Sequence, residues 1–301
     1  MSNNTTLASL VATVRQWISK SENNDTVAPL VDESGWEYLE TPVASDRVSP
    51  QSLTKISNSI AVISGKGGVG KTTTLLGLAG AAARAGESVL VVDLDPQGSL
   101  SAAARDGEVD LTVLAAFSGT PVSELVTDSV WDEFAGSIKI VAANRSLAAV
   151  DHPFTSRSRS TLSAELGELA QFDLVLIDAP ATLSHLTFEA IALAEKVIVV
   201  AEPTRFSLQS AQDALAFAGQ TANGAPIKLV LNKIDASEES EFRVSEIRDA
   251  VPTVVATSTI SVSDEINYAN GAGVPVQAIP GEEAEKAAAE FSALLAEIRA
   301  L

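Results

Sequence analysis

The chain has 301 residues with a hydrophobic content of 46%, so it can bury a substantial core and fits one large α/β domain or two small ones. It contains no cysteine, which excludes a disulfide framework, a thiolate-bound zinc or iron–sulfur centre and a cysteine nucleophile. Its formal net charge of -19 excludes a surface that attracts nucleic acid or anionic lipid everywhere, because both need clustered Lys and Arg; any contact with DNA must be local.

The first 57 residues are predicted to be an appendage. Apolar residues recur at spacings of three and four over residues 6–19, which predicts an amphipathic helix whose stripe packs on the body of the protein or on a partner. Residues 20–57 are polar, acidic and interrupted by prolines, as in a linker. The chain start lacks the pattern of a signal peptide, and no apolar run approaches the roughly 18 residues of a membrane span. We therefore expect residues 1–57 to be an N-terminal helix and acidic linker of a cytoplasmic protein.

The main domain is expected over residues 58–301, where short β-branched runs alternate with helical patterns. Runs that are apolar on both faces, separated by amphipathic helices, indicate right-handed βαβ units and a mostly parallel, doubly wound α/β sheet. The predicted strands are residues 59–64, 88–95, 138–143, 173–179, 196–202, 227–233 and 253–257. In such sheets, ligands bind at the carboxyl ends of the strands.

The stretch SGKGGVGKTTT (64–74) follows the first predicted strand and precedes a predicted helix. Gly65, Gly70, Lys71 and Thr72 fit the phosphate-binding pattern G-x-x-x-x-G-K-[ST]. The glycines let successive N–H groups point at phosphate oxygens. Lys71 is placed to neutralise the β and γ phosphates, and the Thr72 hydroxyl is placed to ligate Mg²⁺.

Two predicted strands carry carboxylates at their ends. Asp178 ends the buried run LVLID, where it can hold a magnesium-bound water opposite Thr72. Asp93 and Asp95 lie in VVDLDPQGSL and point to the same side of a strand, because side chains alternate with period two. One of this pair can orient an attacking water, or both can cap the turn that follows; the pattern leaves both interpretations open.

Three stretches in this order, KGGVGKTTT, VVDLDPQGS and LVLIDAPATLSHLTFEAI, resemble the deviant Walker A ATPases of the ParA/MinD/Soj family, and DLDPQG is most similar to the ParA branch. The resemblance covers roughly residues 58–300 and implies a P-loop NTPase of the SIMIBI type. In that family, an extra lysine near the start of the loop reaches across a nucleotide-sandwich dimer to the phosphates of the other subunit. Lys66 matches it, which implies an ATP-dependent homodimer.

The same resemblance implies roles for individual residues. Asp95 would position the hydrolytic water, Asp93 would support the magnesium shell, and Asp178 would be the Walker B carboxylate. Residues 179–190 would be the switch that senses the γ-phosphate, and Asn232 would read the adenine edge. The implied catalytic residues are Lys66, Asp95 and Lys71, the metal site is Thr72, Asp93 and Asp178, and the nucleotide contacts are Gly65, Lys66, Gly67, Gly68, Val69, Gly70, Lys71, Thr72, Thr73 and Asn232.

The sequence departs from the family towards its C-terminus. Many relatives bind nucleoid DNA there through Lys and Arg, whereas residues 253–271 contain neither. The remaining candidate contacts are scattered: Arg205, Lys228, Lys233, Arg243 and Arg248. The predicted helix over 282–301 has an acidic polar face, unlike the basic membrane-targeting helix of MinD, so we expect no membrane binding.

These patterns predict a slow ATP-hydrolysing switch that uses ATP and Mg²⁺, dimerises with ATP and positions DNA or another cargo. A ParB-like or cargo-adaptor protein would stimulate hydrolysis, and association with the nucleoid or a cell pole stays open. One alternative is a carboxylate ligase or amidase on the same P-loop platform, of the dethiobiotin synthetase or cobyrinate amidase kind. Another is an orphan positioning ATPase that rides on a protein scaffold. A bacterial tyrosine autokinase fits poorly, because the chain has only 2 tyrosines.

Overall fold

The computed structural model describes residues 55–107, 111–151, 166–222 and 224–301, together with Ala12. The helix predicted over residues 6–19 and nearly all of the predicted linker lie outside these residues. The first strand begins at Ile56, close to the predicted start of the main domain at residue 58.

Strands and helices alternate along the described chain, as the apolar runs predict. The strands are β1 Ile56–Ile63, β2 Ser88–Asp93, β3 Val126–Asp128, β4 Ser137–Val141, β5 Leu174–Asp178, β6 Ala194–Ala201, β7 Ile227–Ile234 and β8 Ile260–Ser261. The α-helices are α2 Lys71–Arg84, α3 Ser99–Ala104, α4 Val122–Leu125, α6 His185–Leu193, α7 Arg205–Thr221, α8 Glu238–Ala250, α9 Asp264–Ala272 and α10 Glu282–Arg299. Short 3₁₀-helices are η2 Val113–Ser118, η3 Arg145–Val150, η4 Leu166–Gln171 and η5 Val276–Ala278.

The strands form one sheet in the order β3-β4-β2-β5-β1-β6-β7-β8. Neighbouring strands are parallel, except that β3 pairs antiparallel with β4. This confirms the doubly wound, mostly parallel sheet. The central strand β1 lies between β5 and β6, so the loop that follows β1 emerges beside the carboxyl ends of both.

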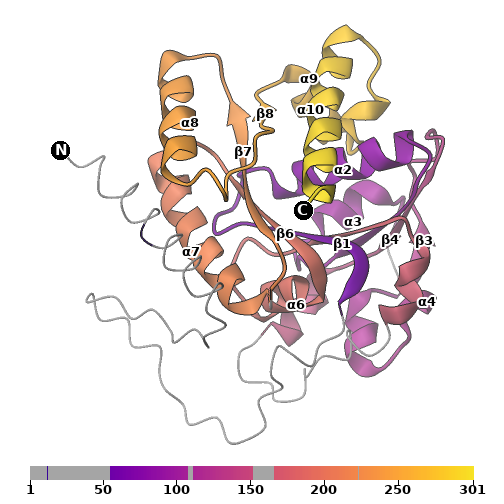
Figure 1. Ribbon diagram of the computed structural model, residues 1–301. Coiled ribbons are helices and arrows are strands. Elements are labelled where there is room, and N and C mark those ends of the chain that lie inside the picture. Colours follow the sequence, from indigo (N-terminus) through magenta and orange to yellow (C-terminus); the bar gives the residue numbers. More distant parts are fainter. Residues whose placement is uncertain (1–11, 13–54, 108–110, 152–165, 223) are drawn as a thin grey trace, which may run out of the picture.

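Helices cover both faces of the sheet (Figure 1). In β1, Ile60 and Val62 pack into the core that includes residues of α2, α9 and α10. The alternate residues Ala61 and Ile63 pack on the opposite side, with residues of α6, α7 and α8. Both faces of the central strand are therefore buried, which explains why it reads as a continuous apolar run.

The contact between α2 and α10 fixes the helix that carries the phosphate-binding lysine. Phe291 of α10 is fully buried, and a Cβ at Gly77 in α2 would lie 2.3 Å from its Cδ1 atom. The missing side chain at Gly77 thus lets the ring of Phe291 lie directly on the backbone of α2.

Two strand predictions were wrong at the edges of the sheet. Residues 253–257 form no strand, because the chain turns through a hydrogen bond from Val254 N to Val251 O, and Val255 makes only a single bridge to Leu229. The short strand β8 ends the sheet on this side instead. The other edge strand, β3, was not predicted, because its 3 residues are too few to show a pattern.

Within the described part of the chain, no helix combines the length and the apolarity needed to cross a bilayer.

Candidate nucleotide-binding site

The loop of residues 64–70 joins β1 to α2 at the carboxyl edge of the sheet. Gly68 has φ 79° and Gly70 has φ 97°, in the left-handed region that glycine adopts without steric cost. Gly70 is the N-cap of α2, so the loop ends at a helix N-terminus whose free N–H groups and dipole favour an anion.

Two glycines of the loop are required by close contacts. A Cβ at Gly65 would lie 2.1 Å from the backbone oxygen of Ser210 in α7, and a Cβ at Gly70 would lie 2.0 Å from Nδ2 of Asn232. Gly67 is different, because the nearest atom to its Cβ would be 3.9 Å away. The structure therefore gives Gly65 and Gly70 a packing role, while a Cβ at Gly67 would make only an ordinary van der Waals contact, with Ala181 Cβ.

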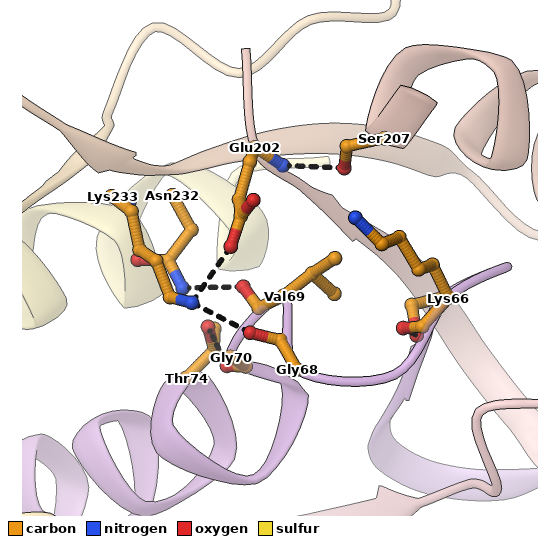
Figure 2. Close-up of polar contacts among 10 residues, drawn as sticks. Lys66, Gly68, Val69, Gly70, Thr74, Glu202, Ser207, Asn232 and Lys233 are labelled. Atoms are coloured by element: carbon orange, nitrogen blue, oxygen red, sulfur yellow. Dashed lines mark hydrogen bonds and ion pairs between the residues drawn. The ribbon is translucent and has the colours of Figure 1, made fainter. Parts of the chain in front are cut away.

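Lys71 and Lys66, the two lysines of the loop, have opposite environments. Lys71 is the first residue of α2 and is buried. Lys66 is exposed; its backbone oxygen accepts from Ser64 Oγ at 2.9 Å, but its side chain makes no hydrogen bond or ion pair with any residue in the described ranges. In Figure 2 the Lys66 side chain lies apart from the contacts that hold the rest of the loop. Val69 is buried, and Thr73 lies in the first turn of α2.

Thr72 and Asp178 meet at the centre of the site. Thr72 Oγ1 donates to Asp178 Oδ2 at 3.0 Å, which joins the first turn of α2 to the end of β5. The other oxygen, Asp178 Oδ1, is buried, and no donor from the described residues reaches it. A buried carboxylate oxygen without a partner is costly, so this atom indicates a place for a cation.

Asp93 lies beside Asp178, since the two are register partners of β2 and β5. Asp93 is fully buried and accepts hydrogen bonds from Ser101 N at 3.0 Å, Ser101 Oγ at 2.6 Å and Asp95 N at 2.9 Å. Burial raises the pKa of Asp93 to about 6. Burial, followed by the negative charge of Asp93, raises the pKa of Asp178 to about 8.

This pair of carboxyl groups fits a Mg²⁺ site. The Thr72 hydroxyl and the Asp178 carboxylate are the oxygen ligands that Mg²⁺ prefers, and a cation there would stabilise the charged forms that burial disfavours in both carboxyl groups. Among the described residues, no three or more His, Cys, Asp or Glu side chains enclose a metal, and Mg²⁺ commonly keeps several waters instead. Both oxygens of Asp93 already accept protein hydrogen bonds, so its place in the magnesium shell stays a prediction.

Asp95 lies in the turn that follows β2 and is half-buried. Its Oδ1 accepts a hydrogen bond from Gln97 N at 2.9 Å, so of the two interpretations of this stretch the turn-capping one is observed. A role of Asp95 in orienting water remains a prediction.

Asn232 is buried beneath the loop. Its Nδ2 donates to Val69 O at 2.8 Å, and its Oδ1 accepts from Lys233 N at 2.8 Å. The structure thus shows Asn232 as a brace for the loop (Figure 2), whereas adenine reading stays a prediction. Next to it, Lys233 contacts Gly68 O and Glu202, which the sequence did not suggest, because it shows Lys233 only as one of several scattered cations.

The predicted switch, residues 179–190, contains a buried acid that sequence reasoning missed. Glu189 of α6 has its Oε1 3.5 Å from Nε2 of His185. No described residue donates to its Oε2, and burial raises its pKa to about 7. The sequence could have indicated this buried acid, because Glu189 is the one charged residue in the mostly apolar stretch of residues 188–193 in α6.

A cavity of about 410 Å³ lies at the opposite edge of the sheet, by the starts of β1, β5 and β6. Its charged lining residues pair within the fold, as in Arg299 with Glu87 and Lys196 with the backbone oxygen of Arg299. It is separate from the phosphate-binding loop.

Comparison with known proteins agrees with this geometry. The family described as an AAA domain (AAA_31) matches residues 57–228, more than half of the chain. The chain belongs to the ParA/MinD family of P-loop ATPases. It is 30% identical to Protein IncC of Escherichia coli over 238 residues, 76% of this chain and 65% of that protein. It is 36% identical to the chromosome-partitioning ATPase Soj of Thermus thermophilus over 158 residues, 52% of this chain and 59% of Soj. The ParA-like chain thus spans less than two thirds of the length of these two relatives.

Solved structures share the fold of this ParA-like chain. A variant of Cyanothece McdA in complex with ATP superposes with a TM-score of 0.69 at 18% identity, covering 82% of this chain and 98% of McdA. Cobyrinic acid a,c-diamide synthase of Mycobacterium smegmatis, with a bound ATP analogue and magnesium, gives a TM-score of 0.61 at 25% identity, covering 73% of this chain and 90% of that protein. The same fold therefore occurs both in McdA, solved with ATP, and in a diamide synthase, solved with an ATP analogue and magnesium.

Proposed function

We propose that this ParA-like chain is an ATP-dependent dimerising switch that segregates or positions DNA or another intracellular cargo, with hydrolysis stimulated by a partner protein. The observation that carries this proposal is the exposed Lys66, which lies on the phosphate-binding loop and whose side chain makes no hydrogen bond or ion pair within the described residues. A lysine kept free at the mouth of the loop is available to the phosphates of a second copy, which would couple dimer formation to bound triphosphate.

In this proposal, the other residues of the site act within one subunit. Lys71 neutralises the β and γ phosphates, Thr72 and Asp178 hold Mg²⁺, and Asp95 orients the attacking water from the turn after β2. Bound Mg²⁺ would stabilise the negative charge that develops on the transferred phosphoryl group. The ATP and magnesium named in the structures of McdA and cobyrinic acid a,c-diamide synthase support both cofactors.

The nature of the cargo is argued from the relatives and from charge. Soj is named a chromosome-partitioning ATPase, and a structural neighbour from Borrelia burgdorferi is named a putative plasmid partition protein, which supports DNA as cargo and a cytoplasmic location. The groove between β8, α9 and α10 argues against DNA as the surface that the dimer binds, because it is acidic. Its lining includes Asp264, Glu265, Glu283 and Glu290, and Lys286 is its one cation among the described residues. A protein scaffold is therefore retained as the alternative to nucleoid DNA.

A second candidate function is an ATP-dependent carboxylate ligase or amidase. It is favoured by the structural likeness to cobyrinic acid a,c-diamide synthase at 25% identity. Such an enzyme would turn over a small carboxylate substrate without any protein partner. In this chain the exposed Lys66 has no assigned task in that chemistry, so we place the switch first.

Phosphate release from ATP–Mg²⁺ tests the proposed function. We expect slow basal turnover by the wild type, none by Lys71→Ala, and wild-type turnover by the matched control Lys228→Ala, whose lysine lies on β7 and donates to Thr253 O. Addition of DNA, or of a basic protein partner, should raise the wild-type rate. Fast turnover that needs only a small carboxylate and ammonia or glutamine would favour the ligase instead.

A further inference from the structure

Three successive carbonyl groups of the phosphate-binding loop each accept a hydrogen bond. Gly68 O accepts from Lys233 Nζ at 2.6 Å, Val69 O from Asn232 Nδ2 at 2.8 Å, and Gly70 O from Thr74 N and Thr74 Oγ1, both at 2.8 Å (Figure 2). These peptide bonds are trans, so the N–H of each peptide unit points opposite to its carbonyl. The donors therefore fix the direction in which three N–H groups face the phosphates.

Of these donors, Lys233 is held in an unfavourable backbone conformation. Its φ is 58°, and besides Asn58 it is the only described residue other than glycine with a positive φ. Asn tolerates this region, whereas a long side chain such as Lys does so at a cost. The pairing of β7 with β8 is irregular between Asn232 and Ile234, at the same point. Glycine would adopt this backbone conformation at a lower cost, so the contacts of the Lys233 side chain should explain why lysine occupies the position.

The contacts of Lys233 supply that reason. Besides Gly68 O, its Nζ contacts Glu202 Oε1 at 2.7 Å, just after β6. Glu202 is in turn held by a hydrogen bond from its backbone N to Ser207 Oγ at 2.9 Å. The ends of β6 and β7 are thus tied to the loop after β1 through one ammonium group. The Lys233 side chain is 47% exposed, so this pair contributes little to global stability.

We propose that Lys233 is a positioning residue for nucleotide binding. Its ammonium group, oriented by Glu202, holds the peptide between Gly68 and Val69 so that the Val69 N–H faces the phosphates. The positive charge of the Lys233 ammonium group, next to Gly68 O, also polarises that peptide and strengthens the Val69 N–H as a hydrogen-bond donor. This inference rests on the proposed function, because it assumes that the loop binds a nucleoside polyphosphate.

The test measures nucleotide affinity and loop order in the full chain with the variant Lys233→Gly. Glycine accepts the positive φ and removes the whole side chain with its ammonium group, which is 47% exposed, so the variant should unfold in urea at the wild-type midpoint or above it. We expect its affinity for a fluorescent ATP analogue with Mg²⁺ to fall about tenfold or more, because a charge-assisted hydrogen bond is lost. Lys233→Arg should keep most of the affinity, and Lys228→Ala is the matched control, because Lys228 also donates to a backbone oxygen from β7.

Amide hydrogen exchange of residues 64–71 is measured on the same proteins without nucleotide. We expect faster exchange of the loop in Lys233→Gly and wild-type exchange in Lys228→Ala. A second variant, Glu202→Gln, should weaken nucleotide binding less than Lys233→Gly and add nothing to it in the double variant, because Glu202 acts through Lys233.

The outcomes separate the two proposals. If the wild type binds the ATP analogue and Lys233→Gly binds it equally well, the positioning role is overturned while the proposed function stands. If the wild type fails to bind any nucleotide, the proposed function fails, and unchanged loop exchange in Lys233→Gly would independently overturn the positioning role. A loss of affinity that merely follows a loss of stability would also count against it.

Discussion

At the scale of single residues, the site concentrates buried acids. Asp93, Asp178 and Glu189 are each nearly inaccessible, and burial is the first cause of the raised pKa in all three. For Asp178, and by prediction for Asp93, a bound cation would supply the neutralising charge. Glu189 lies in α6, within the predicted switch, and its Oε1 lies 3.5 Å from Nε2 of His185.

Glu189 should make the stability of the ligand-free protein depend on pH. Its pKa is raised from an ordinary 4.5 to about 7, so the folded protein binds more protons than the unfolded chain between these values. The free energy of unfolding should therefore fall as pH rises from about 4.5 to about 7, by about 3 kcal/mol at most. Glu189→Gln should remove this loss and be more stable than the wild type at pH 8 but not at pH 4.5. Urea unfolding at both pH values measures this, and the exposed Glu133→Gln should behave as wild type.

Gly65 and Gly67 allow a matched comparison within the loop. A Cβ at position 65 would lie 2.1 Å from Ser210 O, whereas at position 67 the nearest atom would be 3.9 Å away. We expect Gly65→Ala to push α7 from the loop, costing about 1–3 kcal/mol and most of the nucleotide affinity. Gly67→Ala should unfold like the wild type. Equal stability of the two variants in thermal unfolding would contradict the packing described here.

At the scale of elements, α2 is held in place by α10. The fully buried ring of Phe291 lies against Gly77 of α2, so Phe291→Ala would leave a cavity beneath the helix that begins at Lys71. We expect a loss of about 3–5 kcal/mol in unfolding free energy, with weaker nucleotide binding. Phe242→Ala is the control: its side chain is 63% exposed, and its removal should change stability by less than about 0.5 kcal/mol. A loss below about 1 kcal/mol in Phe291→Ala would mean that α10 is not part of this core.

The elements also show what the sequence can and cannot predict. The strands buried on both faces and the loop before Lys71 could be predicted, because apolar runs and glycine spacing are local signals. The edge strand β3 could not be predicted, because it has only 3 residues and is defined by its pairing with β4, which leaves no local pattern. The contact of Lys233 with Gly68 joins residues 165 positions apart through a left-handed backbone, and neither feature has a local pattern.

At the scale of the whole molecule, charge bears on whether the proposed dimer could bind DNA or a protein scaffold. The chain carries a net charge of -19, and the groove by β8, α9 and α10 is acidic. We expect non-specific DNA binding to be weak with ATP and to vanish as salt rises from 50 to 200 mM, because few phosphates can be neutralised. Fluorescence anisotropy of labelled duplex DNA measures this. Tight binding that persists at 200 mM salt would instead require a basic surface outside the described residues.

The most direct test of the central claim is the mass of the purified protein by light scattering with ADP and with ATP–Mg²⁺, for the wild type, Lys66→Ala and Asp95→Ala. We predict that the wild type dimerises only with ATP, that Lys66→Ala stays monomeric although it binds ATP, and that Asp95→Ala accumulates as a stable dimer. A protein that stays monomeric in every nucleotide state, or a Lys66→Ala variant that dimerises like the wild type, would contradict the role given to the second lysine of the loop.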